Sequence, residues 1–270
     1  MINRRAFLIG GTALVGAWRA MPSNPACTLT PEQEEGPYYV NYDQLRSDIT
    51  EGKPGVPLRV RIAVVDANRC TPVSNASLDV WHCDAEGIYS AFTANGNRMF
   101  GGPPPLGPRA DGPPPDGPPP GGGFGPPPGG HRKLDATRFL RGMQTTNAAG
   151  IVEFQTIYPG WYESRAIHIH MKVHTGGHVS HTGQLFFPED VTLSIAKKQP
   201  YAKHKDVHLT TLDEDHVYQE EHGASGMVTL ARMGDGFVAT ATLAIDPEAN
   251  PKPVGMGGPG AGPGFPGPRR

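Results

Sequence analysis

Two histidines and a tyrosine near the middle of the chain have the types and the spacing of metal ligands. His168 and His170 are two residues apart, and Tyr162 precedes the first of them by six residues, behind a Pro-Gly pair. Residues 165–174 alternate as in a strand, so the two imidazoles would share one face and Arg165 would point to the other. Such a pair could bind one metal ion. Neutral imidazoles with an oxygen donor suit a first-row transition metal better than calcium or magnesium.

Short strands separated by Gly and Pro turns must hold these residues in place. One helix is expected at 190–198, between two prolines. Alternating apolar side chains predict strands at 58–65, 76–82, 138–144, 151–157, 165–174 and 183–187, and a terminal hairpin at 227–232 and 237–245. Many short strands at even spacing predict an all-β fold, either a β-sandwich or an open barrel.

The composition excludes some classes of protein and divides the chain. With 270 residues and a net charge of -2, the chain has no basic stripe, which argues against a nucleic-acid partner. Many of its 36 glycines and 30 prolines lie in residues 101–130 and 251–270. These stretches have no apolar pattern, so we expect a flexible insertion and a disordered tail. The rest of residues 28–250 is long enough for one domain with a core.

Residues 1–20 have the features of an export signal. The sequence NRRAFL at 3–8 is a twin-arginine start, and the apolar run that follows has the length of a signal core. That run is too short for a membrane span. We therefore expect export by the twin-arginine route to the periplasm or the exterior. A short amphipathic N-terminus of a cytosolic protein is the alternative.

The chain has three cysteines, Cys27, Cys70 and Cys83. An odd count allows at most one intramolecular disulfide. The sequence alone does not say which pair forms, or whether any pair does.

Five blocks of sequence stand in the order found in one enzyme family. The blocks are WHCDAEGIY (81–89), FLRG (139–142), GIVEFQTIYPGWY (150–162), RAIHIH (165–170) and QLFF (184–187). Together they resemble the intradiol ring-cleavage dioxygenases, the family of protocatechuate 3,4-dioxygenase and catechol 1,2-dioxygenase. The opening LTPEQEEGPYY at 29–39 is similar to that of the exported, twin-arginine members. The resemblance covers residues 28–245 without the insertion, and it implies a single β-sandwich domain.

The resemblance also implies a cofactor and a reaction. The cofactor would be a non-haem Fe(III) ion held by two tyrosinates and two histidines, which fall on Tyr89, Tyr162, His168 and His170. The reaction would use O2 to cleave a catechol-type ring between its two hydroxyl-bearing carbons, giving a muconate-type diacid. Family members often associate, so the resemblance leaves room for a homo-oligomer.

Further residues take roles by the same resemblance. Tyr162 would leave the metal and act as a base for one substrate hydroxyl, and Arg165 would stabilise negative charge on the ring. Gln184 matches a family glutamine near the same pocket. Only six residues separate Tyr162 from His168, fewer than in the better-known members, and Tyr158 is a rival for its position.

Some residues and functions remain open at this stage. Tyr38 and Tyr39 are expected to pack, with the substrate pocket as the alternative, and His178 and His181 to lie in a Gly-rich loop. One competing function is a non-catalytic exported β-sandwich binding module. A second is a zinc or copper enzyme that uses the two histidines without the tyrosines. The His-x-His pair taken alone also fits a surface strand with scattered histidines.

Overall fold

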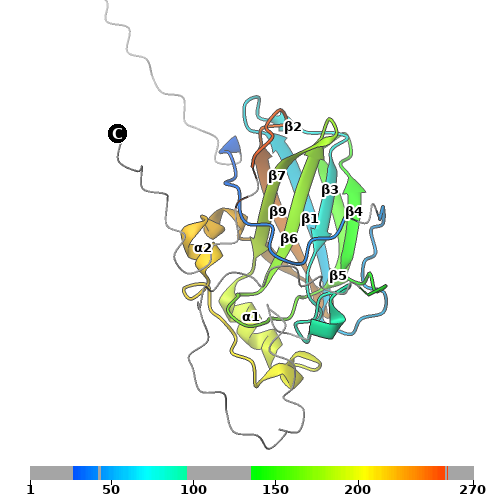
Figure 1. Cartoon of the computed structure of the whole chain (residues 1–270), viewed down its shortest axis with the longest axis vertical. Coiled ribbons are helices and arrows are strands. Elements are labelled where there is room, and N and C mark those ends of the chain that lie inside the picture. The colour runs from blue at the N-terminus through cyan, green and yellow to red at the C-terminus, as the bar shows by residue number, and fades with distance from the viewer. Residues whose placement is uncertain (1–26, 42–43, 96–134, 253, 255–270) are drawn as a thin grey trace, which may run out of the picture.

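The computed structural model of the chain describes residues 27–41, 44–95, 135–252 and 254 (Figure 1). The expected export signal at 1–20, the insertion at 101–130 and nearly all of the expected tail lie outside these residues. No helix within the described residues is long and apolar enough to cross a membrane.

Two sheets pack face to face, which confirms the predicted all-β sandwich (Figure 1). The five-stranded sheet has the order β2-β1-β9-β8, with β5 also paired to β1. The four-stranded sheet has the order β4-β3-β6-β7. The strands are β1 Pro57–Asp66, β2 Thr71–Pro72, β3 Ser77–Trp81, β4 Arg141–Thr145, β5 Ile151–Ile157, β6 His168–Thr175, β7 His178–Phe186, β8 Thr229–Met233 and β9 Gly236–Ile245.

Side chains that alternate along the strands build the core between the sheets. On β1, every second residue from Leu58 to Val64 is buried. On β6, Ile169 and Met171 enter the same core. The residues that alternate with these two along β6 point away from this core, yet they are buried as well. Something else must therefore cover the outer face of the four-stranded sheet.

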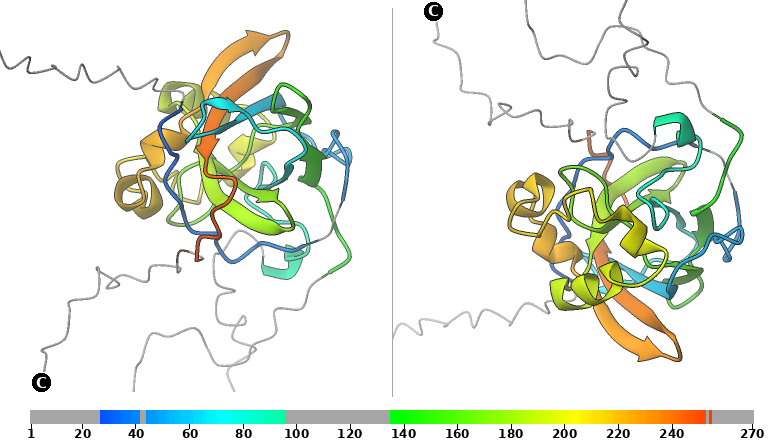
Figure 2. Two further views of the ribbon diagram at one scale, coloured as in Figure 1. Left: turned by 90° about the horizontal axis from the view of Figure 1, so that it is seen from above. Right: turned by 90° about the horizontal axis from the view of Figure 1, so that it is seen from below.

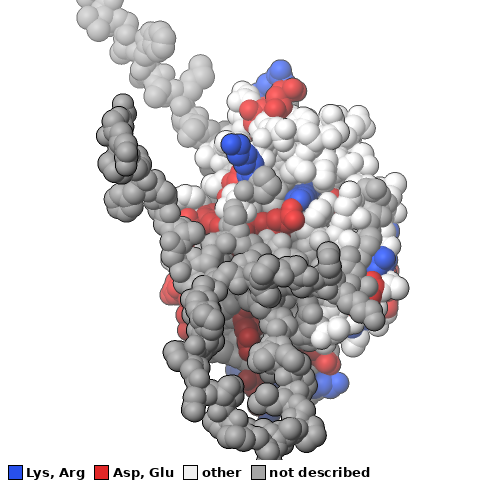
Figure 3. Space-filling model, in the orientation of Figure 1, with Lys and Arg blue, Asp and Glu red and all other residues white. Residues whose placement is uncertain are grey.

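The N-terminal residues 30–40, here called the cover segment, cross that outer face (Figure 1). Gln33 N–H donates to the carbonyl of Thr182 on β7 at 3.0 Å. Lys172 on β6 forms an ion pair with Glu35 of the cover segment. Acidic and basic side chains adjoin across the middle of this face in Figure 3. The cover segment thus replaces solvent over β6 and β7.

Residues 187–228 form no strand and gather at one end of the sandwich (Figures 1 and 2). They contain helix α1 Glu189–Ala196 and helix α2 His216–Glu220, with short 3-10 turns at Tyr201–His204 and Gly223–Gly226; a further 3-10 turn, Thr93–Asn95, lies elsewhere in the chain. The predicted helix at 190–198 is present as α1, one residue earlier at its start and two at its end. The predicted terminal hairpin is present as β8 and β9, and it forms one edge of the five-stranded sheet because β9 also pairs with β1 (Figure 2).

The strand predicted at 183–187 begins earlier than the sequence suggested. Gly176 and Gly177 both have positive φ, 54° and 86°, and turn the chain directly from β6 into β7. His178 and His181 therefore lie on a strand, and their placement in a loop was wrong.

A disulfide joins Cys27, just before the cover segment, to Cys70 between β1 and β2. Cys83 is free and buried. The bond ties the start of the cover segment to the body of the sandwich.

Candidate active site

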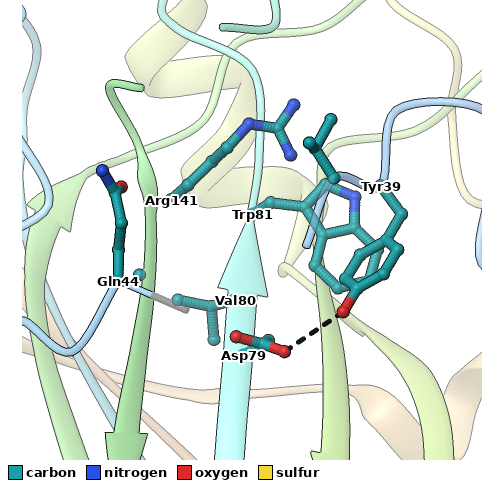
Figure 4. Close-up of a pocket in the computed structure, with 8 residues that line it drawn as sticks. Tyr39, Gln44, Asp79, Val80, Trp81 and Arg141 are labelled. Atoms are coloured by element: carbon teal, nitrogen blue, oxygen red, sulfur yellow. Dashed lines mark hydrogen bonds between the residues drawn. The ribbon is translucent and has the colours of Figure 1, made fainter. Parts of the chain in front are cut away.

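One row of directly paired residues crosses the outer face of the four-stranded sheet. Arg141 on β4 pairs with Trp81 on β3, Trp81 pairs with His170 on β6, and His170 pairs with Gln184 on β7. Paired residues of neighbouring strands share a face, so these four side chains lie side by side under the cover segment. At one end of the row, Trp81 and Arg141 line a pocket with Tyr39 and Asp79, whose side chains are hydrogen-bonded (Figure 4).

Four polar atoms converge beside this row. His168 Nε2 lies 3.0 Å from His170 Nε2, 3.1 Å from Tyr162 Oη and 3.5 Å from Tyr89 Oη. The histidines come from β6, Tyr162 from the turn before it, and Tyr89 from the loop after β3. All four side chains are buried. The four residues predicted to hold a metal are thus brought together, from three separate parts of the chain.

The hydrogen bonds of His168 leave its Nε2 as an acceptor. Its Nδ1 lies 2.6 Å from the carbonyl oxygen of Ala166, which accepts only, so Nδ1 carries the proton. Burial, with the nearby charge of Arg165, lowers the pKa of His168, and burial, with His168 and then Arg165 as neighbours, lowers the pKa of His170. Both rings are therefore neutral, and His168 presents a lone pair at Nε2.

This donor set fits a metal ion. One lone pair cannot serve two hydroxyl groups and a second imidazole at once, whereas a central cation would bind all four atoms. Metal–ligand bonds of about 2.0–2.2 Å place neighbouring ligand atoms about 3.3–3.6 Å apart in a tetrahedral set, close to the spacing here. Among the described residues, no group of three or more His, Cys, Asp or Glu could hold a metal ion, so the tyrosines are needed to complete the set.

The hydroxyl groups of the two tyrosines stay protonated unless a nearby positive charge offsets the negative charge of the phenolates. Burial, with the neighbouring Tyr162, raises the pKa of Tyr89 well above its usual value. Burial also raises the pKa of Tyr162, although the guanidinium of Arg165 opposes that effect. A bound cation would supply the missing charge and favour both phenolates, as metals do for coordinating thiols.

His170 is held by packing rather than by a hydrogen bond. Its ring stacks on Trp81, with centroids 5.0 Å apart and planes within 4°. Its Nδ1 is buried and has no hydrogen-bond partner. Gly36 of the cover segment packs closely against the same ring. A Cβ added at Gly36 would lie only 2.9 Å from His170 Cε1. Gly36 also has a φ of 71°, so both its space and its backbone require glycine.

Arg165 lies fully buried beside the four donors, at the centre of a polar network. Its Nε donates to Asp215 Oδ2 at 3.0 Å, its Nη2 to Gln184 Oε1 at 2.5 Å, and its Nη1 to Glu34 Oε1 at 3.4 Å. Burial alone would lower the pKa of Arg165, but Tyr162 and the two carboxylates hold it above its usual value. The guanidinium therefore remains charged without contact with solvent.

Comparisons with known proteins give the family. No protein-family model matches the chain, and no curated protein matches it. A solved intradiol ring-cleavage dioxygenase from Tetranychus urticae is 31% identical, over 84% of this chain and 98% of that one, with a TM-score of 0.69. The chain belongs to the intradiol ring-cleavage dioxygenases. The crystal structure of a second dioxygenase is 32% identical, over 83% of this chain and 98% of that one, with a TM-score of 0.67. The protein is therefore an oxidoreductase, and the binding-module alternative is set aside.

The dioxygenase fold separates Tyr162 from its rival Tyr158. Tyr158 Oη lies 2.7 Å from Thr192 Oγ1, and its ring packs against Phe187 in the core between the sheets. Tyr162 instead belongs to the aromatic cluster around Tyr89. Only Tyr162 reaches the site.

The cover segment of the dioxygenase contributes more than the sequence analysis foresaw. Tyr38 stacks on Tyr89 at 4.2 Å and meets Tyr162 edge to face at 6.0 Å, which confirms packing as its role. Gln33 Oε1 accepts from the backbone N–H of Gln184 at 2.7 Å. Glu34 reaches Arg165, as described above. No signal in the sequence marked these contacts, because a charged run such as EQEE at 32–35 is ordinarily exposed to solvent.

His82 of the dioxygenase is a buried structural residue. Its Nδ1 donates to the carbonyl of Cys83 at 2.7 Å, and its Nε2 accepts from Thr156 Oγ1 at 2.7 Å. Burial lowers its pKa from 6.5 to about 4. His82 is fully buried, and its bond to Thr156 joins the end of β3 to β5.

This burial makes stability depend on pH. Between pH 6.5 and 4, the unfolded chain protonates His82 and the folded chain does not, so the free energy of unfolding falls as pH decreases through that window. One pKa unit corresponds to about 1.4 kcal/mol, so His82 accounts for about 3 kcal/mol of the fall. Urea unfolding of the wild type and His82→Gln from pH 7 to 4 should show a shallower loss in the variant. Parallel losses in the two proteins would refute the assignment.

Proposed function

We propose that the protein is a non-haem Fe(III)-dependent intradiol dioxygenase that cleaves a catechol-type ring with O2 between the two hydroxyl-bearing carbons, yielding a muconate-type diacid. The supporting observation is the convergence of two tyrosine oxygens and the Nε2 of His170 on His168 Nε2, at distances of 3.0–3.5 Å from it. Tyr89, Tyr162, His168 and His170 would hold the iron. Phenolates are hard, anionic donors, which favours ferric iron over zinc or copper held by the two histidines without the tyrosines.

The bound Fe(III) would draw electron density from a catechol ring and so open the ring carbons to O2. Tyr162 supplies the base. Its Oη takes the proton of one substrate hydroxyl, and a buried phenolate is basic enough for that transfer because burial raises its pKa. Tyr162 lies between β5 and β6 rather than within either strand, and its side chain would have to leave the metal for this role.

Arg165 stabilises the negative charge that develops on the substrate ring. Its guanidinium is fully buried, so its charge acts without screening by water. Gln184 accepts from Arg165 Nη2, and its own Nε2 donates to the carbonyl of Glu34 at 3.0 Å. Gln184 thus holds the guanidinium against the cover segment. The cover segment and the aromatic cluster exclude water from the reacting atoms.

A visible absorption spectrum of the aerobically purified protein tests this function. With iron bound by two tyrosinates, the protein should be red-brown, and its band should shift when catechol is added under nitrogen. Oxygen uptake with catechol should then accompany formation of a diacid. A protein that remains colourless after reconstitution with ferric or ferrous iron would refute the proposal.

We also propose that the protein is exported by the twin-arginine route to the periplasm or the exterior. The support is the NRRAFL sequence at 3–8, together with the Cys27–Cys70 disulfide, since disulfides persist in oxidising compartments. Replacing Arg4 and Arg5 by lysine should retain the protein in the cytoplasm of a bacterial host that has this pathway. Export of the double variant at the wild-type level would contradict the route.

A further inference from the structure

Asp215 lies directly before α2 and is fully buried between the arginine and the metal-binding half of the site. We propose that Asp215 is a positioning residue that fixes Arg165 and the iron ligand His168 together, so that ring activation and metal binding depend on one carboxylate. This inference rests on the function proposed above.

The carboxylate of Asp215 accepts three hydrogen bonds. Its Oδ2 accepts from Arg165 Nε at 3.0 Å and from the backbone N–H of Ala166 at 2.6 Å. Its Oδ1 accepts from the backbone N–H of Tyr218 at 3.0 Å, which caps α2. Burial alone would raise the pKa of Asp215, but the charge of Arg165 holds it below its usual value. The group therefore remains an acceptor on both oxygens.

The bond to Ala166 continues to the metal ligand. The N–H of Ala166 binds Asp215, and the carbonyl of the same residue accepts from His168 Nδ1 at 2.6 Å. Both peptide groups flanking Ala166 are thereby fixed. The orientation of this carbonyl sets the ring plane of His168 and directs Nε2 at Tyr162 and Tyr89.

The bond to Arg165 fixes the other half of the site. Nε is the guanidinium nitrogen nearest the backbone, so its bond to Asp215 fixes the plane of the guanidinium. Nη1 and Nη2 reach Glu34 and Gln184 from that plane. Glu34 binds the same guanidinium through Nη1, at the far end of the fork, and its backbone bonds run to Gln184 and Glu221. His170 depends on Trp81 and Gly36 instead of on this chain of bonds. Asp215 thus differs from Glu34 in reaching the metal ligand.

An asparagine cannot replace the carboxylate. Its amide has one acceptor oxygen, and its NH2 group would face either Tyr218 N–H or the pair of donors from Arg165 and Ala166. In one orientation Asp215→Asn loses the bonds to Arg165 and Ala166, and in the other it keeps them only as weaker bonds to a neutral acceptor, so the variant loosens both groups in either case. Glu34→Gln is the matched comparison, because it removes a carboxylate from the same guanidinium without touching the Ala166 bond.

The experiment compares the wild type, Asp215→Asn, Glu34→Gln and Val217→Ala. Iron affinity is measured by titrating the iron-free proteins with iron and following the tyrosinate band, and kcat and KM are measured on the loaded enzymes with catechol. Asp215→Asn should lower iron affinity about 10–100-fold, as loss of a partner behind a metal ligand does, and should lower kcat as well. Glu34→Gln should lower kcat while its iron affinity stays near that of the wild type. Val217→Ala removes buried side-chain volume from α2 and should lower only the thermal midpoint.

Two results would overturn the positioning role while leaving the proposed function intact: wild-type iron affinity in Asp215→Asn, or an equal loss of affinity in Glu34→Gln. If Asp215→Asn fails to fold, Asp215→Glu replaces it. The longer side chain keeps the charge beside Arg165 but displaces the bond to Ala166, so iron affinity should still fall, and an unchanged affinity would refute the role. Failure of the wild type itself to bind iron would instead refute the proposed function.

Discussion

A His168→Ala variant is expected to lose its iron and its ring-cleavage activity. His168 Nε2 lies within 3.5 Å of all three other donor atoms, so its removal takes away the atom on which the set converges. Loss of a residue behind a ligand alone costs about 10–100-fold in metal affinity, so loss of the ligand itself should cost at least a hundredfold. Iron content per chain, the tyrosinate band and oxygen uptake with catechol measure the effect.

His174→Ala is the matched control. His174 lies on the same strand, and its Nε2 bonds to Asp79 Oδ2 at 2.9 Å, away from the four donor atoms. This variant should retain iron and the visible band. If His168→Ala keeps one iron per chain, its band and full turnover, then the proposed ligand set is wrong.

The local pattern of the chain was enough to predict the strands and to bring out the two histidines. Alternation along β6 depends only on neighbouring residues, so it indicated correctly that His168 and His170 share a face. The order of the sequence blocks added Tyr89 to the set, although Tyr89 lies in the loop after another strand, β3. Strand alternation is a local pattern, and the order of the blocks is recognised by resemblance, so both can be read from the sequence alone.

The position of Arg165 was predicted wrongly from the same alternation. β6 begins at His168, and the chain turns before it at Ser164, which has a φ of 63°. Arg165 therefore is not on the core face with Ile169. It meets Gln184, which pairs directly with His170 on the outer face. Asp215 and Glu34, far from Arg165 in sequence, fix it there.

Asp215 and the cover segment were missed because nothing local marks them. Asp215 precedes a short helix in a segment without strand periodicity, and its role depends on a contact across 50 residues. Gly36 could be recognised as a helix breaker, but its contact with His170 follows only from the path of the cover segment over β6. Long-range contacts between irregular segments carry no repeating pattern that a sequence could display.

Arg165→Lys should lower kcat about 10²–10³-fold, the effect of removing one donor that stabilises developing charge. A lysine keeps one positive charge but lacks the planar fork that reaches Asp215, Gln184 and Glu34 in three directions. The two carboxylates would remain buried with poorer compensation. Removing one partner of a buried pair altogether costs about 3–5 kcal/mol, so the weakened pairing in Arg165→Lys should lower the thermal midpoint by less than that loss would. Steady-state kinetics with catechol and thermal unfolding measure the two effects.

A control must separate the fall in stability of Arg165→Lys from its fall in kcat. Arg46→Lys is the control, because Arg46 also donates to three acceptors but lies away from the donor atoms of the site. The acceptors are Glu51 at 2.5 Å and the carbonyls of Arg138 at 2.6 Å and Arg141 at 2.8 Å. Arg46→Lys should lose stability and keep its kcat. The iron band of Arg165→Lys should persist, since arginine is not a ligand, so a loss of kcat in protein that retains its iron locates the effect in the reaction. Equal kcat values for Arg165→Lys and the wild type would show that a point charge is sufficient and that the fork serves the fold alone.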